Sequence, residues 1–230
     1  MPMEPFLLSE RNETLHAHTL TDEAACRRYL EKVQQKMQAP SLLTAASQFS
    51  KRYAWFVVQA AFSPMTLEGR KPLVTLGESQ LVTDWSAEKW SPVFEPGDTP
   101  EASREEEVLR EVFTRHLTPI WRTLHAVSRV PMPILWENTA IRVFSLYEKK
   151  LNAAEDAPAP EKLQQDLSSI VQDAPGEVFD TSFNPLRPFY TSNFENRRGT
   201  DVRVRQTCCF VYETDGGRSC CKVCPKFHKL

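Results

Sequence analysis

Five of the six cysteines of this chain lie in its last stretch, and they are the residues whose type and spacing most clearly indicate chemistry. The five are Cys208, Cys209, Cys220, Cys221 and Cys224. Only Cys26 stands among the first two hundred residues. Thiols crowded at one end of a chain indicate a local site rather than a distributed disulfide framework. Four thiolates are the ligand set that a tetrahedral zinc ion or an iron–sulfur cluster requires.

Three kinds of site fit these cysteines: an iron–sulfur cluster, a structural zinc ion and disulfide bonds. The favoured ligand set follows the pattern C-C-x11-C-x2-C and is Cys208, Cys209, Cys221 and Cys224. Adjacent residues of an extended strand point to opposite faces, so Cys208 and Cys209 need a bend before both serve one site. A two-iron cluster is larger than a single zinc ion and tolerates a wider spread of sulfurs. The spacing therefore favours iron–sulfur, with zinc next and disulfides last.

The residues around the cysteines carry a family resemblance. A basic residue and a threonine precede the double cysteine in the segment 205–212, a Gly-Gly pair follows at 216–217, and a C-x-x-C-P motif ends at Pro225. Upstream, Asn184-Pro185-Leu186 is followed by an arginine pair. Over roughly residues 184–225 the chain resembles the FhuF-like ferric siderophore reductases, and before that the similarity is vague.

The resemblance implies a cofactor and a reaction. Family members hold a [2Fe–2S] cluster on four cysteines, which correspond to Cys208, Cys209, Cys221 and Cys224 here. That cluster reduces Fe(III) bound by a siderophore. The family's usual interval between the cysteine pairs is one residue shorter, and Cys220 satisfies that count. We predict Cys221 as the third ligand, because C-x-x-C forms a tight turn with both sulfurs on one side, and Cys220 is then a spare thiol.

Charge near the cysteines supports an anionic group. From Arg197 to Leu230 the chain has eight Lys and Arg residues but three Asp and Glu residues. Positive charge stabilises a four-thiolate cluster, which gains negative charge on reduction. Many siderophore complexes are also anionic, so the candidate substrate contacts are Arg197, Arg198 and Arg205. A role of these arginines in folding or in tuning the cluster is equally open.

Composition excludes several other classes. The 230 residues are 41% hydrophobic and 25% charged with a net charge of −2, which is typical of a globular protein and unlike a general nucleic-acid binder. The start lacks a secretory signal, and no window is apolar enough to cross a membrane, so we expect a cytoplasmic protein. Neither GxGxxG nor a P-loop occurs. We therefore expect electrons to come from an external donor, a ferredoxin or a flavoprotein.

The apolar periodicity predicts an α+β fold, with a mostly helical body, a small β region and a hairpin-like C-terminal clip. We expect helices near 21–37, 41–62, 103–120, 133–147 and 163–170, and a hairpin from 72–76 and 80–84. The run at 152–160 is the clearest linker. The predicted parts are a body at 1–152, a linker with an irregular approach at 153–200, and a cluster segment at 201–230.

Several local features make these expectations specific. Cys26 lies on the apolar stripe of the first helix and is expected in the core, and the nearly all-apolar second helix should be central. Ser103 and Glu106 form a capping box, and Pro119 should break or kink its helix. Strand formers at 203–212 and a turn at 215–217 would close the clip. His16 and His18 are expected in a solvated segment rather than in a metal site.

Together these features predict a cytoplasmic oxidoreductase, a ferric siderophore reductase that uses its cluster to release Fe(II). No acid–base residue is needed for that reaction. Two alternatives remain at this stage. One is a non-catalytic interaction module in which zinc staples the tail. The other is a siderophore-assembly or chelate-binding protein that resembles the reductases only in its tail.

Overall fold

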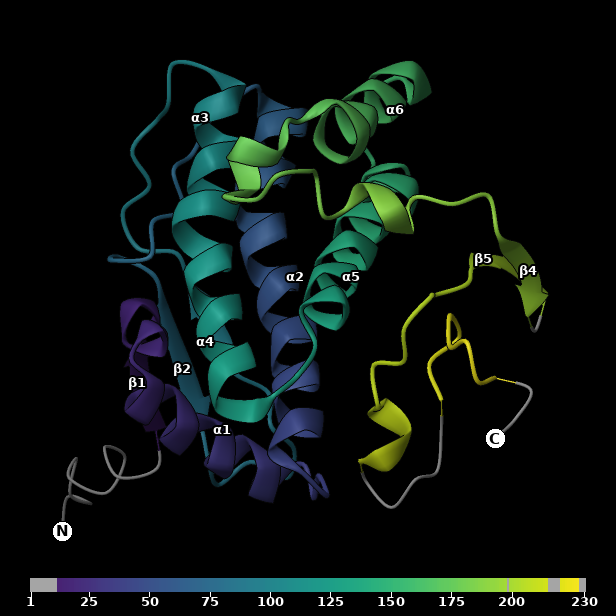
Figure 1. The fold of residues 1–230 in the computed structure, drawn as a ribbon. Coiled ribbons are helices and arrows are strands. Elements are labelled where there is room, and N and C mark those ends of the chain that lie inside the picture. The colour runs from purple at the N-terminus through teal and green to yellow at the C-terminus, as the bar shows by residue number, and fades with distance from the viewer. Residues whose placement is uncertain (1–11, 198, 215–219, 228–230) are drawn as a thin grey trace, which may run out of the picture.

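The structure is a computed structural model and describes residues 12–197, 199–214 and 220–227. Its central element is helix α2 (Leu42–Glu68), which is largely buried (Figure 1). Ser41 caps the helix by accepting the N–H of Thr44, and Gly69 ends it in a left-handed conformation. The predicted central helix is confirmed and runs past Pro64. Among the described residues, no helix combines the length and the apolar character needed to cross a membrane.

Three further helices pack around α2 (Figure 1). They are α1 (Glu23–Lys36), α4 (Thr118–Ser128) and α5 (Met132–Ser145). The cap of α1 is Asp22, one residue after the predicted start, because a 3₁₀ turn occupies Ala17–Thr21. Cys26 is fully buried, as expected from the apolar stripe. The predicted class, α+β with a helical body, is confirmed.

The helix that leads into α4 differs from the prediction. It begins as α3 (Glu105–Arg110) and passes through the π-helical segment η3 (Glu111–Leu117) directly into α4. The capping box was wrong in its partner, since the N–H of Ser103 donates to Glu107 rather than to Glu106. Pro119 does not end the helix, because it stands in the first turn of α4, and the wider π turn before it accommodates its missing donor.

The chain after α5 follows the prediction closely. A π-helical segment η4 (Leu146–Leu151) extends α5, and residues 152–159 form turns where the linker was expected. The expected short helix is α6 (Pro160–Ser168), continued by η5 (Ser169–Asp173). Two 3₁₀ turns, η6 (Gly176–Phe179) and η7 (Arg187–Phe189), make the irregular approach to the tail. The division of the chain into three parts stays a prediction.

The small sheet is built differently from the predicted hairpin. Its central strand is β2 (Gln80–Asp84), which pairs antiparallel with β1 (Asn12–His16) and β3 (Val93–Glu95). Residues 72–76 were wrongly assigned as its partner, and Pro72 makes only an isolated bridge to Glu101. The reason is that β1 supplies the hydrogen bonds along the whole length of β2. His16 and His18 are exposed, as expected, although His16 ends a strand.

The tail carries its own two-stranded sheet. Strands β4 (Phe194–Arg197) and β5 (Thr200–Arg203) form an antiparallel hairpin before the cysteines, on the far side of α5 from β1 and β2 (Figure 1). The strand predicted over 203–212 was wrong, because the chain from Val204 is irregular and ends in the 3₁₀ turn η8 (Val211–Glu213). The turn predicted at 215–217 lies outside the described residues.

A buried polar pair lies inside the aromatic core of the body. Tyr53 of α2 stacks on Phe49 with ring centroids 5.3 Å apart and meets Trp121 edge to face. Its hydroxyl lies 2.7 Å from His116 Nε2, and His116 Nδ1 lies 2.8 Å from the carbonyl oxygen of Val74. The carbonyl can only accept, so Nδ1 carries the proton and Nε2 accepts from the tyrosine. Burial lowers the pKa of His116 from 6.5 to about 4, despite the bond to Val74.

We therefore expect a component of stability that falls with acid. The unfolded chain binds a proton at His116 below about pH 6.5, whereas the folded protein does so only below about pH 4. This component is complete above pH 6.5 and is lost as the pH falls toward 4. Urea unfolding should give about 2 kcal/mol less stability at pH 5 than at pH 7.5 from this group. His116→Gln should be less stable at both values but should lose that difference; an unchanged pH dependence would contradict the assignment.

Candidate metal centre

Two sulfurs of the cysteine segment already lie at the separation expected for two ligands of one metal. Cys209 Sγ and Cys221 Sγ are 3.9 Å apart. Two thiolates bound at about 2.3 Å to a tetrahedral ion lie about 3.8 Å from each other. The sulfur opposite Cys209 belongs to Cys221 rather than to Cys220, which favours the predicted C-x-x-C choice.

The other two sulfurs share a different local geometry. Cys208 Sγ accepts the backbone N–H of Phe210 at 3.4 Å, and Cys224 Sγ accepts that of Lys226 at 3.3 Å. In each case the donor stands two residues after the cysteine. Such a bond favours the charged thiolate, the form that binds metal, but burial outweighs it at Cys208 and raises the pKa of that thiol. Cys208 and Cys224 are also close enough to interact electrostatically.

Cys209 and Cys221 form a close sulfur pair, whereas Cys208 and Cys224 share only the same kind of backbone N–H contact. No group of three His, Cys, Asp or Glu side chains among the described residues is gathered closely enough to hold one ion. A single zinc site needs four sulfurs around one point, whereas a [2Fe–2S] cluster spreads its four ligands over two irons. One close pair with two further thiols on the same loops is therefore more compatible with the larger cluster than with a single ion.

Protonation of the closer pair is asymmetric. The pKa of Cys209 is lowered because the Cys221 thiol donates to it, and because Lys51 and Arg205 add positive charge. The pKa of Cys221 is raised by the same bond. Lys51 Nζ lies 3.8 Å from Cys209 Sγ. A metal binding here would displace the proton of this bond. By contrast, burial raises the pKa of Cys26 to about 12, which marks an inert core thiol.

Glu137 of α5 fixes the backbone just before the double cysteine. This carboxylate is 1% exposed and accepts the backbone N–H of Gln206 at 2.6 Å and of Thr207 at 2.8 Å. The Thr207 hydroxyl also donates to it. Arg205 Nη2 lies 3.3 Å from the same carboxylate, so the buried charge is paired. One helical side chain thereby satisfies the donors of an irregular segment that has no strand partner.

Helix α2 fixes the double cysteine itself. The carbonyl oxygen of Cys209 accepts from Ser47 Oγ at 3.0 Å and from the side-chain amide of Gln48. Asn138 of α5 donates to the carbonyl oxygen of Ser47 at 2.9 Å and so ties the two helices together at this point. Farther along, Thr44 Oγ1 donates to Glu213 at 2.6 Å. Polar side chains of α2 and α5 therefore hold the loop that contains Cys208 and Cys209 against the body.

Arg197 holds the C-x-x-C turn that contains Cys221 and Cys224. Its Nη1 donates to the carbonyl oxygens of Lys222 at 2.9 Å and of Cys224 at 2.6 Å. Glu195 Oε2 lies 2.7 Å from Arg197 Nη2 and pairs with its charge. The backbone N–H of Arg205 donates to the carbonyl oxygen of Val223 at 3.0 Å and joins the two cysteine arms. The hairpin β4–β5 thus positions the C-x-x-C turn, a role that the sequence assigned to a strand after it.

The arginines predicted to contact a substrate lie elsewhere than on an open surface. Arg197 and Arg205 are each 3% exposed and are engaged with the cysteine loops. Arg198 lies outside the described residues. A bulky chelate cannot reach the two buried guanidinium groups. We therefore treat Arg197 and Arg205 as groups that hold the loops and tune their charge.

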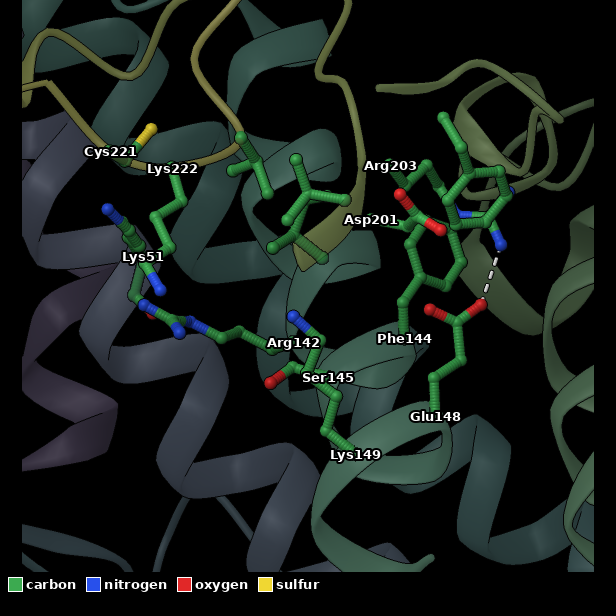
Figure 2. Close-up of a pocket in the computed structure, with 14 residues that line it drawn as sticks. Lys51, Arg142, Phe144, Ser145, Glu148, Lys149, Asp201, Arg203, Cys221 and Lys222 are labelled. Atoms are coloured by element: carbon green, nitrogen blue, oxygen red, sulfur yellow. Dashed lines mark hydrogen bonds and ion pairs between the residues drawn. The ribbon is translucent and has the colours of Figure 1, made fainter. Parts of the chain in front are cut away.

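Arg203 attaches the hairpin to the body. Its guanidinium lies over the rings of Phe144, Tyr190 and Phe194, at 5.1, 4.5 and 4.6 Å from their centroids. Its Nη2 lies 2.6 Å from Glu148, and Figure 2 draws this contact as a dashed line. Its Nη1 donates to the carbonyl oxygen of Thr191. Cation–π contacts and a largely buried ion pair together make this a strong local attachment.

The helical side chains that hold the cysteine loop were not identified from the sequence. Glu137 and Asn138 interrupt the apolar pattern of α5, and Ser47, Gln48 and Lys51 interrupt that of α2. A carboxylate on the buried face of a helix requires a partner, which is the signal that could have found it. The identity of the partner, a loop some seventy residues away, was not available from spacing.

The residues present could supply the ligands of an iron–sulfur cluster. Four cysteines lie on the two loops, and Arg205 and Lys51 supply positive charge beside Cys209. Arg205 Nη1 is buried without a hydrogen-bond partner among the described residues, which is the state of a donor placed next to an anionic group. No protein-family model matches the chain, and a search of the curated proteins finds no match either.

Proposed function

We propose that this chain is an iron–sulfur oxidoreductase that reduces ferric siderophores and thereby releases Fe(II). The 3.9 Å approach of the Cys209 and Cys221 sulfurs, with Cys208 and Cys224 on the same two loops, carries the proposal. The resemblance of residues 184–225 to the FhuF-like reductases supplies the reaction class. A reducing cytosol, where clustered thiols bind metal rather than form disulfides, suits such a site.

A [2Fe–2S] cluster, when bound, takes up a single electron from a donor and can give it to Fe(III). The donor in this proposal is an external ferredoxin or flavoprotein. Fe(II) is held far less tightly than Fe(III) by hard oxygen ligands, so reduction releases the metal. The protein residues bind the cluster and adjust its charge, while the chemistry itself belongs to the cofactor.

The chain's own contribution can be assigned residue by residue. Cys208, Cys209, Cys221 and Cys224 would together hold the cluster. The backbone N–H groups of Phe210 and Lys226 donate to the sulfurs of Cys208 and Cys224. Hydrogen bonds to cluster sulfurs and nearby positive charge raise the potential, since they favour the more negative reduced form. Cys209 and Cys224 are buried, whereas the other two ligands are partly exposed and leave an edge open to electron transfer.

Anaerobic purification followed by absorption and EPR spectroscopy tests the proposal. We expect visible charge-transfer bands in the oxidised protein, about two irons per chain, and an EPR signal after one-electron reduction. Mixing the reduced protein with a ferric chelate and a ferrous-specific dye should then show Fe(II).

Two outcomes would contradict the proposal in different ways. A colourless protein with one zinc per chain would assign the thiols to a structural staple, because zinc thiolates do not absorb visible light. A coloured protein whose reduced cluster is not reoxidised by any ferric chelate would leave a cluster protein that binds chelates or assembles them without reducing iron.

A further inference from the structure

We propose that the cavity beside Cys221 is a binding site for polycarboxylate anions, either free or as the ligand shell of a trivalent metal chelate. The cavity lies between the tail and the body and has a volume of about 310 Å³. It is lined from the body by α2, α5 and η4, and from the tail by β4–β5 and the Cys221–Val223 turn (Figure 2). This inference rests on the proposed function for its biological meaning, but the site itself is argued from charge and geometry.

The two ends of the cavity differ in charge. Cys221, Lys222 and Lys51 lie together at one end, with Arg142 next to them, as Figure 2 shows. At the other end the acidic side chains already have partners. Glu148 pairs with Arg203 at 2.6 Å, and Asp201 accepts from Asn196 at 2.8 Å. The end nearest the candidate ligands is therefore the positive one.

Of the five described cations that line the cavity, Arg203 pairs with Glu148 and the other four have no acidic partner among the described residues. Within the described part of the chain, no carboxylate lies within 4.0 Å of Lys51, Arg142, Lys149 or Lys222. Elsewhere on the protein, cations such as Arg70, Arg110 and Lys162 are paired with acids. Several unpaired cations converging on one concave site favour an anion, since such a site concentrates negative ligands.

Arg142 is a partly buried cation of the cavity lining that has other cations near it. Its Nε donates to the carbonyl oxygen of Lys51 at 2.9 Å, which fixes the guanidinium in place. Burial, with the charges of Arg205 and Arg52, lowers the pKa of Arg142 to about 10. An anionic ligand would relieve this repulsion. Arg203 lines the same cavity and has a buried Nε without a hydrogen-bond partner among the described residues.

The chemistry of the lining selects carboxylates of modest size. Guanidinium and ammonium donors bind carboxylate oxygens through charge-assisted hydrogen bonds. A volume of about 310 Å³ is at the small end of ligand sites and accepts a citrate-sized anion or one arm of a larger chelate. Ile141, Val202 and Val223 give the cavity apolar walls that strengthen these contacts. A carboxylate bound here would bring a coordinated metal close to Cys221.

Calorimetric titration of the purified full-length protein with two probes tests the site. The probes are citrate and gallium(III) citrate, whose metal resists reduction. Lys149 and Lys222 are exposed, so the double variant Lys149→Gln/Lys222→Gln should fold normally. We expect the affinity for the bound probe to fall about tenfold, the loss typical of a pair of charge-assisted contacts. Raising the salt concentration should also weaken binding to the unaltered protein.

The matched control is Lys150→Gln/Lys226→Gln, which removes the same charge from neighbouring positions. Lys150 lies over Trp55 and Lys226 over Tyr212, and neither lines the cavity. This control should retain its affinity. Tighter binding of gallium(III) citrate would assign the site to the chelate, and equal or tighter binding of citrate to the free anion. No binding of either probe, or an equal loss in the control, would overturn the site.

Failure of the site and failure of the proposed function remain distinguishable. Gallium binding requires no electron transfer, so a colourless protein that binds gallium(III) citrate would keep the site and remove the reductase. A coloured protein that binds neither probe would keep the cluster and remove the site.

Discussion

The visible absorption of the purified protein should disappear when any one of four cysteines is replaced by serine. The four are Cys208, Cys209, Cys221 and Cys224. Each would supply one of only four ligands, and serine oxygen is a poor substitute for a thiolate at iron. Bound iron should fall from about two per chain to near zero. Absorption spectra and metal analysis of anaerobically purified variants measure this effect.

Two cysteines serve as controls for these variants. Cys26 is fully buried in the body and distant in sequence from the site, so Cys26→Ser should keep the spectrum even where it lowers stability. Cys220→Ser should also keep it, since the sulfur facing Cys209 is that of Cys221. A native spectrum in Cys221→Ser, with loss of the cluster in Cys220→Ser, would show that the third ligand was chosen wrongly.

Replacing Glu137 by alanine should release the cysteine loop from the body. The change removes the acceptor of two backbone N–H groups and leaves the buried Arg205 without its counter-charge. Loss of one partner from a buried ion pair costs about 3–5 kcal/mol. We expect rapid hydrogen exchange and proteolysis within 204–214 while the helical circular dichroism of the body persists. Glu137→Gln should be intermediate, because it keeps one acceptor oxygen but loses the charge.

Glu111 provides the matched control for this effect. It is another nearly buried carboxylate in a helical segment, 6% exposed, and it pairs with Arg115 far from the tail. Glu111→Ala should leave exchange within 204–214 unchanged, whatever it does to the body. Residues 204–214 could instead stay as protected from exchange in Glu137→Ala as in the unaltered protein. The loop would then be held by other contacts, and the polar side chains of α2 and α5 would not be its main support.

Local periodicity was sufficient for the helices. The apolar stripe that contains Cys26 and the nearly continuous apolar run of α2 predicted helices that exist, and the expected start of the second helix agrees with its cap at Ser41. These elements depend on hydrogen bonds and side-chain contacts three or four residues apart, which the sequence displays directly. A break at Pro119 did not occur, because this proline stands in the first turn of α4.

The partner of each strand could not be predicted from the spacing of residues in the sequence. Residues 72–76 had strand character and lay close to β2 in sequence, yet β1, more than sixty residues earlier, took the place beside it. In the tail, residues 203–212 were strand formers, but Glu137, Ser47 and Gln48 satisfy their backbone groups instead of a neighbouring strand. A strand's partner is chosen by the packing of the whole chain, so its own composition cannot specify it.

By itself, the sequence determined that five thiols lie in one short stretch, that a basic segment surrounds them and that a mostly helical body carries them. Only the tertiary structure decided that Cys221 rather than Cys220 faces Cys209. It also decided that Arg197 and Arg205 are buried and hold the cysteine loops. It also placed cations from α2, α5 and the tail, which have no acidic partner among the described residues, around one cavity. The reason is physical: ligand type is a property of single residues, whereas burial, pairing and electrostatic potential arise only when distant segments are packed together.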